Sequence, residues 1–187
     1  MIKKFALGLL VFVGALVLIG FLLPSTYAVE RSVTIKAQPQ AIHAYVGDLR
    51  KWPDWTAWNL TKFPDMKYSY EGDPTAVGGA QVWSGESSGN GRLSITSTDA
   101  ATGLDFLLDF EQGKYVSTGT IDYTPVGAET VVTWRNTGDL GMNPLSRWMG
   151  LAFDSMMGPD FEQGLDKLKT SVEAPAPNSP ATAPTAK

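Results

Sequence analysis

His43 is the only histidine of this 187-residue chain, and the chain has no cysteine. Metal sites built from several histidines, thiolate ligands, thiol nucleophiles and disulfides are therefore excluded. Acid–base catalysis would need His43 or a tyrosine together with a charged side chain inside a pocket. The charged strand residues that qualify are Arg31, Glu86, Arg92, Asp109 and Arg135. Because no acid partner of His43 is defined, we assign no catalytic residue, no metal site and no cofactor, and a non-enzyme is favoured.

Three arginines on expected strands, Arg31, Arg92 and Arg135, have a second possible use. A guanidinium inside a cavity can bind a carboxylate or phosphate head group in a bidentate manner. The alternative is that each arginine faces solvent or pairs across the sheet with an acidic side chain. The acidic residues in question are Glu86, Asp109 and Asp122. We favour this second interpretation for each of the three arginines.

Trp52, Trp55 and Trp58 lie at intervals of three in the segment KWPDWTAWNL. Three rings at this spacing could form an aromatic cage around a ligand, or they could pack a loop onto the core. We favour packing, because burial is the commoner use of aromatic side chains. Pro53 biases Trp52 away from helical backbone. The sequence therefore predicts Trp55 and Trp58 as the buried pair and Trp52 as a residue at the rim of a site.

A run of 19 uncharged residues, 5–23, lies near the N-terminus. As a helix it would be about 28 Å long, close to the thickness of the hydrocarbon core of a bilayer. Lys3 and Lys4 precede it, which favours a cytoplasmic N-terminus and a periplasmic or extracellular C-terminal domain. The alternative is a cleaved signal peptide with its site at residues 26–28. We favour a single-pass membrane anchor over residues 1–28, because the apolar run is longer than a secretory signal requires.

Charge and composition limit the partners and the number of domains. The formal net charge of −4 argues against nucleic acid as a partner, since binding a phosphate backbone needs a basic surface. Residues 173–187 are rich in Pro, Ala, Ser and Thr and are predicted to be disordered. The remaining residues, 29–172, have the size of one ordinary domain.

Alternating apolar and polar residues predict strands through most of this domain. The sharpest alternation places Leu104, Phe106, Leu108 and Phe110 on one face. The glycines of Gly89-Asn90-Gly91 favour positive φ and predict a hairpin turn there. Short turns between successive strands indicate an antiparallel sheet. The predicted strands cover residues 29–37, 67–71, 80–86, 92–98, 104–110, 115–124 and 130–136.

The chain changes to helical spacing at two places. A short amphipathic helix is predicted around residues 39–49, after the first strand. From Leu145 to Val172 the apolar residues recur at intervals of three and four, which predicts a helix that crosses the whole sheet. Gly158-Pro159 interrupts this pattern, either as a kink or as the junction of two consecutive helices. The predicted fold class is therefore α+β, with an added N-terminal transmembrane helix.

Two stretches of the domain carry a family resemblance. VERSVTIKAQPQAIHAYVGDLRKWPDWTAW resembles the opening strand, first helix and tryptophan segment of the SRPBCC superfamily, the START-like or polyketide cyclase/dehydrase group. FEQGLDKLK, residues 161–169, is similar to the end of its last helix, and the apolar leader resembles a membrane-anchored bacterial branch. The resemblance implies a helix-grip fold, in which a curved antiparallel seven-strand sheet wraps around a long C-terminal helix and encloses an apolar cavity.

Members of this superfamily bind lipids, sterols, hormones or polyketides, and only some of them are enzymes. The resemblance therefore implies a membrane-tethered domain that binds a hydrophobic small molecule or lipid between the sheet and the C-terminal helix. The alternatives are a cyclase-like enzyme acting on a hydrophobic substrate and a non-catalytic stress-response or assembly module with a collapsed cavity. The residues predicted to line the cavity are Trp83, Phe106, Phe110, Tyr123, Trp134, Trp148, Met149, Phe153 and Met156.

Overall fold

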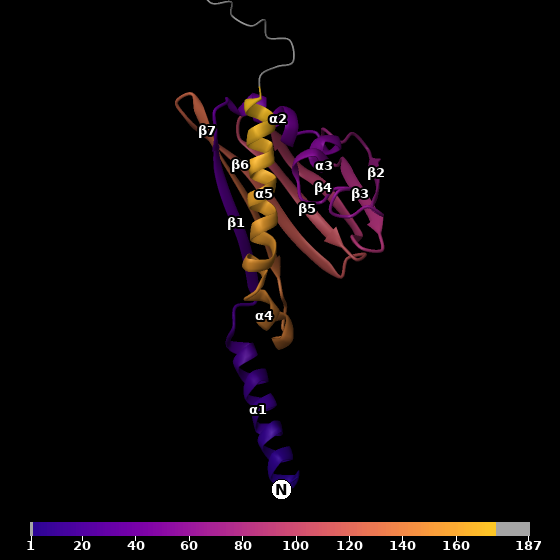
Figure 1. Ribbon diagram of the computed structural model, residues 1–187, viewed down its shortest axis with the longest axis vertical. Coiled ribbons are helices and arrows are strands. Elements are labelled where there is room, and N and C mark those ends of the chain that lie inside the picture. The colour runs from indigo at the N-terminus through magenta and orange to yellow at the C-terminus, as the bar shows by residue number, and fades with distance from the viewer. Residues whose placement is uncertain (1, 175–187) are drawn as a thin grey trace, which may run out of the picture.

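A seven-stranded antiparallel sheet forms the body of the protein in the computed structural model, which describes residues 2–174 (Figure 1). Its strands are β1 (Thr26–Ile35), β2 (Lys67–Glu71), β3 (Ala80–Gly85), β4 (Gly89–Asp99), β5 (Gly103–Phe110), β6 (Tyr115–Val126) and β7 (Glu129–Asp139). Their order is β1-β7-β6-β5-β4-β3-β2, so the six consecutive strands form a meander and β1 closes it beside β7. The predicted seven-strand antiparallel sheet is confirmed.

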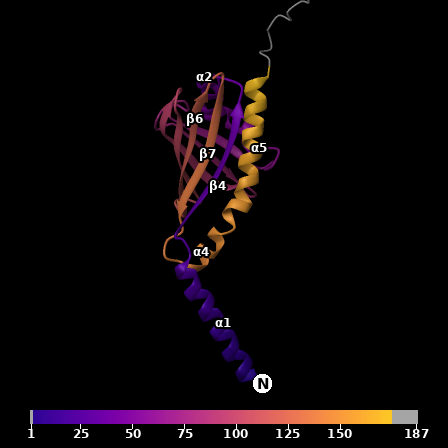
Figure 2. The ribbon, with the colours of Figure 1, turned by 90° about the vertical axis from the view of Figure 1, so that its left-hand side faces the viewer.

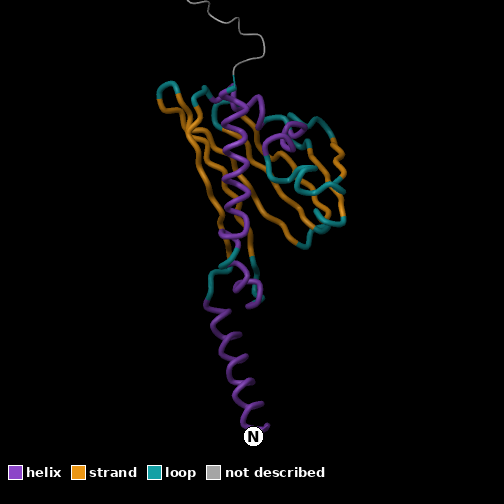
Figure 3. Tube along the Cα trace, in the orientation of Figure 1, coloured by secondary structure: helices purple, strands orange, loops and turns teal. Residues whose placement is uncertain are grey.

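The helices lie along one face of the sheet and at one end of it. They are α1 (Ile2–Leu22), α2 (Pro39–Val46), the short 3-10 helix η1 (Leu49–Lys51), α3 (Trp52–Trp55), α4 (Pro144–Gly150) and α5 (Phe153–Glu173). Helix α5 runs along the sheet beside β1, and α1 extends away from the domain with α4 at the junction (Figure 2). The elements coloured by type in Figure 3 show the same division between sheet and helices. The α+β helix-grip architecture is confirmed.

The predicted alternation of strand faces explains where the core lies. On β1, Val29 and Ile35 are fully buried, and the residues between them are alternately exposed and partly buried. On β7, Val132 and Trp134 are buried at every second position. Helix α5 closes over these strands with Phe161 and its later apolar residues, because its stripe recurs with the helical period. The core is therefore the layer between the sheet and α5.

The C-terminal helical region breaks at a different place from the predicted one. Helix α4 ends at Gly150, and α5 begins at Phe153, whereas Pro159 lies inside α5. The two helices pack against different partners, α4 against α1 and α5 against β1, so the chain changes direction between them. Proline is costlier than glycine inside a helix, so local preference alone would place the break at Pro159, and the contacts of α4 with α1 place it after Gly150 instead.

One turn and one strand boundary also differ from the sequence prediction. Residues Gly89 and Gly91 lie within β4, and the β3–β4 turn is made by residues 86–88. Strand β1 starts at Thr26, inside the segment predicted as the anchor. Residues 175–187 of the predicted disordered tail lie outside the described residues.

Helix α1 contains the stretch Lys4–Leu22, which is long and apolar enough to cross a membrane. A signal sequence near an N-terminus has the same length and composition. Nearly all of its described side chains are exposed, as expected of a helix that does not belong to the core of the domain.

Candidate functional site

A cavity of about 550 Å³ lies between the concave face of the sheet and the helical layer. Its size is within the range of small-molecule sites, and its lining is mainly aromatic and aliphatic. Seven of the nine residues predicted from the sequence contribute to this lining: Trp83, Phe106, Phe110, Trp134, Met149, Phe153 and Met156. The cavity is open rather than collapsed, contrary to the expectation for an assembly module.

The closed end of the cavity is a cluster of aromatic rings. Trp134 of β7 stacks on Phe161 of α5 with ring centroids 4.1 Å apart and an interplanar angle of 6°. Trp52 stands perpendicular to Phe106 at 5.3 Å and lies 5.1 Å from Trp55. Such offset and edge-to-face arrangements are the favourable geometries of aromatic pairs. Rings from β5, β7, α3 and α5 thus seal one end of the cavity.

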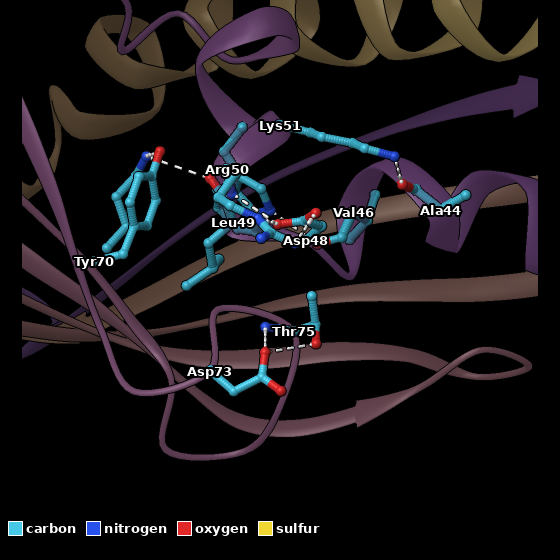
Figure 4. A network of polar contacts seen from close by, with 11 residues as sticks. Ala44, Val46, Asp48, Leu49, Arg50, Lys51, Tyr70, Asp73 and Thr75 are labelled. Atoms are coloured by element: carbon cyan, nitrogen blue, oxygen red, sulfur yellow. Dashed lines mark hydrogen bonds and ion pairs between the residues drawn. The ribbon is translucent and has the colours of Figure 1, made fainter.

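Trp52 is held in this cluster by the short helices that precede it. Asp48 caps η1 by accepting a hydrogen bond from the Arg50 amide at 3.0 Å and receives the Arg50 guanidinium at 2.8 Å (Figure 4). The Lys51 ammonium donates to the Ala44 carbonyl at 2.6 Å, which ties the end of η1 back to α2. The Trp52 indole N–H donates to the Val46 carbonyl at 2.8 Å, so its buried donor is satisfied.

Trp55 is buried as predicted, but the roles of Trp52 and Trp58 were predicted in reverse. Trp52 and Trp55 are almost fully buried, whereas Trp58 is partly exposed. The Trp58 carbonyl accepts a hydrogen bond from the Tyr68 hydroxyl at 2.7 Å, and the Lys62 ammonium lies 5.8 Å from its ring centroid. The prediction failed because Pro53 occupies the first turn of α3, where proline is tolerated and Trp52 remains helical.

Glycines opposite the cavity aromatics keep the concave face hollow. Gly91 pairs with Trp83, and Gly119 pairs with Phe106. A Cβ atom placed at either glycine would lie about 2 Å from the opposing ring. Each ring therefore lies flat over a glycine instead of projecting into the cavity. A side chain in place of either glycine would push the opposing ring into the cavity and reduce the cavity volume.

Three side chains from β1, β6 and β7 form a connected polar group in the mainly apolar lining, which also includes Thr56, Gln81, Lys114, Asp139 and Ser146. The Tyr27 hydroxyl donates to Asn136 Oδ1 at 3.0 Å, and Asn136 Nδ2 donates to Ser117 Oγ at 3.1 Å. All three residues line the cavity, and Asn136 is only 2% exposed. Burial raises the pKa of the Tyr27 phenol, so Tyr27 is a neutral hydroxyl at physiological pH. The group offers hydroxyl and amide atoms, and no charge, to a bound molecule.

The other end of the cavity opens to the surface between the β5–β6 turn and α4. The lining residues there are exposed, among them Tyr115 and Val116 at the start of β6 and Met149 on α4. By contrast, the lining residues of the closed end, such as Trp52 and Trp134, are buried. The mouth of the cavity therefore lies at the end of the domain from which α1 departs (Figure 1).

The fold agrees with comparisons to known proteins. The family described as polyketide cyclase / dehydrase and lipid transport matches residues 26–173, which is nearly the whole chain outside α1 and the C-terminal tail. The chain belongs to this family. No curated protein sequence matches the chain.

Solved structures of low sequence identity share the family fold. A solution structure of a protein from Thermobifida fusca is 15% identical with a TM-score of 0.59, covering 78% of this chain and 92% of that one. A protein from Arthrobacter aurescens is 19% identical with a TM-score of 0.57, covering 80% and 87%. The di-domain ARO/CYC StfQ of the steffimycin biosynthetic pathway is 13% identical with a TM-score of 0.60, covering 79% of this chain and 51% of StfQ.

Two residues predicted to line the cavity of this polyketide cyclase-like domain lie elsewhere. Tyr123 of β6 is buried against α2 outside this lining, and its hydroxyl lies 3.2 Å from His43 Nδ1. Trp148 contacts α1, because the helix break at residues 151–152 removes α4 from the stripe of α5. The prediction for Trp148 assumed one continuous helix. Ligand binding by the other seven residues stays a prediction.

The charged residues considered for catalysis or head-group binding do not line the cavity. Arg31 contacts Asp154 and Glu162 of α5 at 2.7 and 2.6 Å. Arg92 pairs with Glu71 at 3.1 Å, and Arg135 lies 3.7 Å from Glu30. The pairing interpretation therefore describes the three arginines, although each partner differs from those predicted. His43, Glu86 and Asp109 also lie outside the lining.

Five further residues that matter to the geometry line the cavity, and of these the sequence had placed only Trp52 at the site, as a rim residue: Tyr27, Trp52, Trp58, Ser117 and Asn136. Strand parity gives a signal for three of them, because Tyr27 shares the inward face of β1 with Val29, and Asn136 that of β7 with Trp134. Ser117 likewise shares the face of Ile121 on β6. Trp52 and Trp58 are placed by long-range packing, which strand parity does not predict.

Proposed function

We propose that this protein is a membrane-tethered member of its family that binds a hydrophobic small molecule or lipid in the cavity between the sheet and α5. The observation that carries the proposal is the cavity of about 550 Å³, whose wall is mainly apolar and whose mouth is open. Apolar surface transferred from water into such a cavity gains about 25 cal/mol per Å². An open cavity of this kind would favour an apolar guest over water.

The buried polar group of Tyr27, Ser117 and Asn136 supports a ligand with a polar atom at a fixed place. Tyr27, Ser117 and Asn136 could exchange a hydrogen bond with a hydroxyl, carbonyl or ester group of the guest. The group carries no charge, which makes it better suited to a neutral polar atom than to a free phosphate. A few placed polar groups in an apolar pocket orient a ligand without supplying most of the affinity.

The start of β1 supports an uncleaved anchor. Residues 26–28, the site at which a signal peptidase would cut, belong to β1 and pair with residues 137–139 of β7. Tyr27 also contributes its hydroxyl to the cavity and contacts the Phe153 ring with centroids 4.6 Å apart. Cleavage there would remove part of a paired strand and of the cavity wall. Tethering through α1 keeps both in place.

The test is recovery of a ligand from the purified full-length chain by solvent extraction and mass spectrometry. Leu108→Trp places a large ring in the cavity, and Leu107→Trp places the same ring on the outer face of the same strand. We expect a ligand in the parent and in Leu107→Trp, and little or none in Leu108→Trp. A chain that carries no ligand and shows no thermal shift with any lipid class would contradict the proposal. So would equal recovery from the two tryptophan variants.

A further inference from the structure

Helix α4 packs against the C-terminal end of α1 (Figure 2). The Trp148 indole N–H donates to the Leu16 carbonyl at 3.0 Å. The Arg147 guanidinium donates to the carbonyls of Phe21 at 2.8 Å and of Leu23 at 3.2 Å. Those carbonyls are free acceptors because they lie at the end of the helix, where a cation is also favoured by the helix dipole. The position of α4 along α1 is thus fixed by two side chains.

A close backbone contact reinforces this arrangement. Gly20 is the one buried residue among positions 4–22 of α1, and a Cβ added to it would lie 2.6 Å from Pro144 Cβ of α4. Gly8 and Gly14 of the same helix have nothing within 4 Å of such an atom. Small residues allow helices in a bilayer to approach closely. The contact at Gly20 therefore marks the place where α4 packs on α1.

The side of α4 turned away from α1 is apolar and exposed. Leu145 is 67% exposed and Met149 54%, and the flanking residues Met142 and Leu151 are exposed as well. These four large apolar side chains, on and beside a seven-residue helix, form an exposed apolar patch that is unfavourable in water. The acidic Asp139 and Asp154 lie outside α4 itself, whose one charged residue is Arg147. This surface has the composition of one that contacts lipid.

The contacts with α1 give the depth of this surface. Leu16 lies six residues before Leu22, the last residue of α1, a rise of about 9 Å along the helix. Arg147 contacts the carbonyls at the very end of α1, at the level where arginine and tryptophan side chains anchor a transmembrane helix at the membrane interface. With α1 across a bilayer, the Trp148 indole lies below that interface, and Pro144, packed against Gly20, brings the start of α4 into the same leaflet.

We propose that α4 is immersed in the leaflet that surrounds the C-terminal half of α1, with Leu145, Met149 and Leu151 in contact with lipid. The proposal rests on the membrane anchor of the proposed function and specifies the surface through which the domain meets the bilayer. Because Ser146 and Met149 also line the cavity, one wall of its mouth then contacts the leaflet directly. A hydrophobic guest would reach the cavity from the bilayer along this wall.

The test uses the absence of native cysteine, which permits labelling at single positions. Leu145→Cys, Leu151→Cys, Leu10→Cys and Val126→Cys are made in the full chain, labelled with a nitroxide and reconstituted into phosphatidylcholine vesicles. Collision with oxygen reports lipid, and collision with a water-soluble nickel chelate reports water. Val126 lies at the β6–β7 turn, remote from α1, and is 58% exposed. We expect the oxygen-to-nickel ratio at 145 and 151 to be several-fold higher than at 126 and close to that at 10.

A second pair of variants tests the docking of α4. Gly20→Leu inserts a side chain where Pro144 lies, whereas Gly14→Leu meets open space. The ratio at position 145 should fall in the Gly20→Leu background and stay unchanged in the Gly14→Leu background. Labels at 145 and 151 that behave like the one at 126, or a label at 10 that reports water, would overturn the proposal. A chain that yields no bound ligand but keeps the lipid signal at 145 would refute the proposed function alone.

Discussion

Gly119 of β6 lies directly opposite Phe106 of β5, and the Phe106 ring covers the position that a side chain at 119 would take. A Cβ atom at 119 would be 2.0 Å from Phe106 Cζ. The backbone of the sheet stays in register, so the ring can leave this position only toward the cavity. The glycine therefore contributes to the volume of a cavity that it does not line.

Gly119→Ala is expected to move the Phe106 ring into the cavity and to reduce the amount of co-purified ligand. Overpacking of this kind costs about 1–3 kcal/mol, so the free energy of unfolding should also fall by that amount. Urea unfolding and mass spectrometry of extracted ligand measure the two effects. Thr118→Ala is the control, because its exposed side chain lies on the outer face of the same strand. Full ligand recovery from Gly119→Ala would contradict this role of Gly119.

The sheet could be predicted from the sequence because the patterns that specify it lie within single strands and the short turns between them. Alternation in β5 and β7 fixes which side chains face inward, and short turns between strands allow only an antiparallel meander. The break between α4 and α5 could not be predicted in this way. Pro159 is the stronger local signal, but the helix tolerates it, while α4 is turned aside by its contacts with α1 at Gly20 and Leu16.

Phe161→Ala removes the ring stacked on Trp134 at the closed end of the cavity. Phe161 is 2% exposed, so the substitution leaves a void in a packed cluster. We expect the free energy of unfolding to fall by about 3–5 kcal/mol. Urea unfolding followed by circular dichroism measures the loss. Val126→Ala, at an exposed site, should change stability by no more than about 0.5 kcal/mol. A similar small effect at Phe161 would show that the stack does not support the fold.

Arg31→Met should lower the melting temperature, because one guanidinium bonds both Asp154 and Glu162 and joins β1 to α5. Arg31→Lys should restore only part of the loss, since an ammonium lacks the planar fork that serves two carboxylates. Arg31 holds the pKa of the Asp154 carboxyl below its usual 3.8. The stabilisation by this pair is therefore complete above pH 3.8 and is lost as the pH falls through the lower folded-state pKa.

Calorimetry across pH 7 to pH 3 measures both effects of Arg31. The difference in melting temperature between the parent and Arg31→Met should persist down to about pH 4 and shrink below it. Added salt should reduce the difference, because the carboxylates of both partners are more than half exposed. A Lys variant as stable as the parent would show that a point charge suffices and that the forked geometry is unimportant.

The candidate site could be predicted only in part, for a physical reason that differs among its residues. The alternation of residues along β5 and β7 predicts that Phe106 and Trp134 face the cavity. The same alternation places Asn136 on the inward face, but a search for aromatic residues alone does not identify this polar residue. Trp52 depends on the capped turn at η1 and on rings from distant strands. The position of Trp148 was predicted wrongly because an apolar stripe defines a common face only within one continuous helix, and α4 and α5 are separate helices.

His43 gives the last prediction, which concerns stability near neutral pH. Its ring nitrogens lie 3.2 Å from the Tyr123 hydroxyl and 3.1 Å from the Thr98 hydroxyl. Burial lowers the pKa of His43 below its usual 6.5, although the nearby Asp99 carboxylate opposes the shift. The folded state therefore favours neutral His43. Its contribution to stability is complete above pH 6.5 and is lost as the pH falls from there through the folded-state pKa.

The melting temperature of the parent should accordingly decrease as the pH is lowered from 7.5 to 5.5. Histidine is the side chain whose ordinary pKa falls in this range, and His43 is the only histidine of the chain. His43→Gln keeps an amide that can bond both hydroxyls but has no proton to gain in that range. Its melting temperature should be lower than that of the parent at pH 7.5 and should change less on acidification. Differential scanning fluorimetry at matched ionic strength measures the two slopes. Equal slopes for the parent and His43→Gln would assign the pH dependence to groups other than His43.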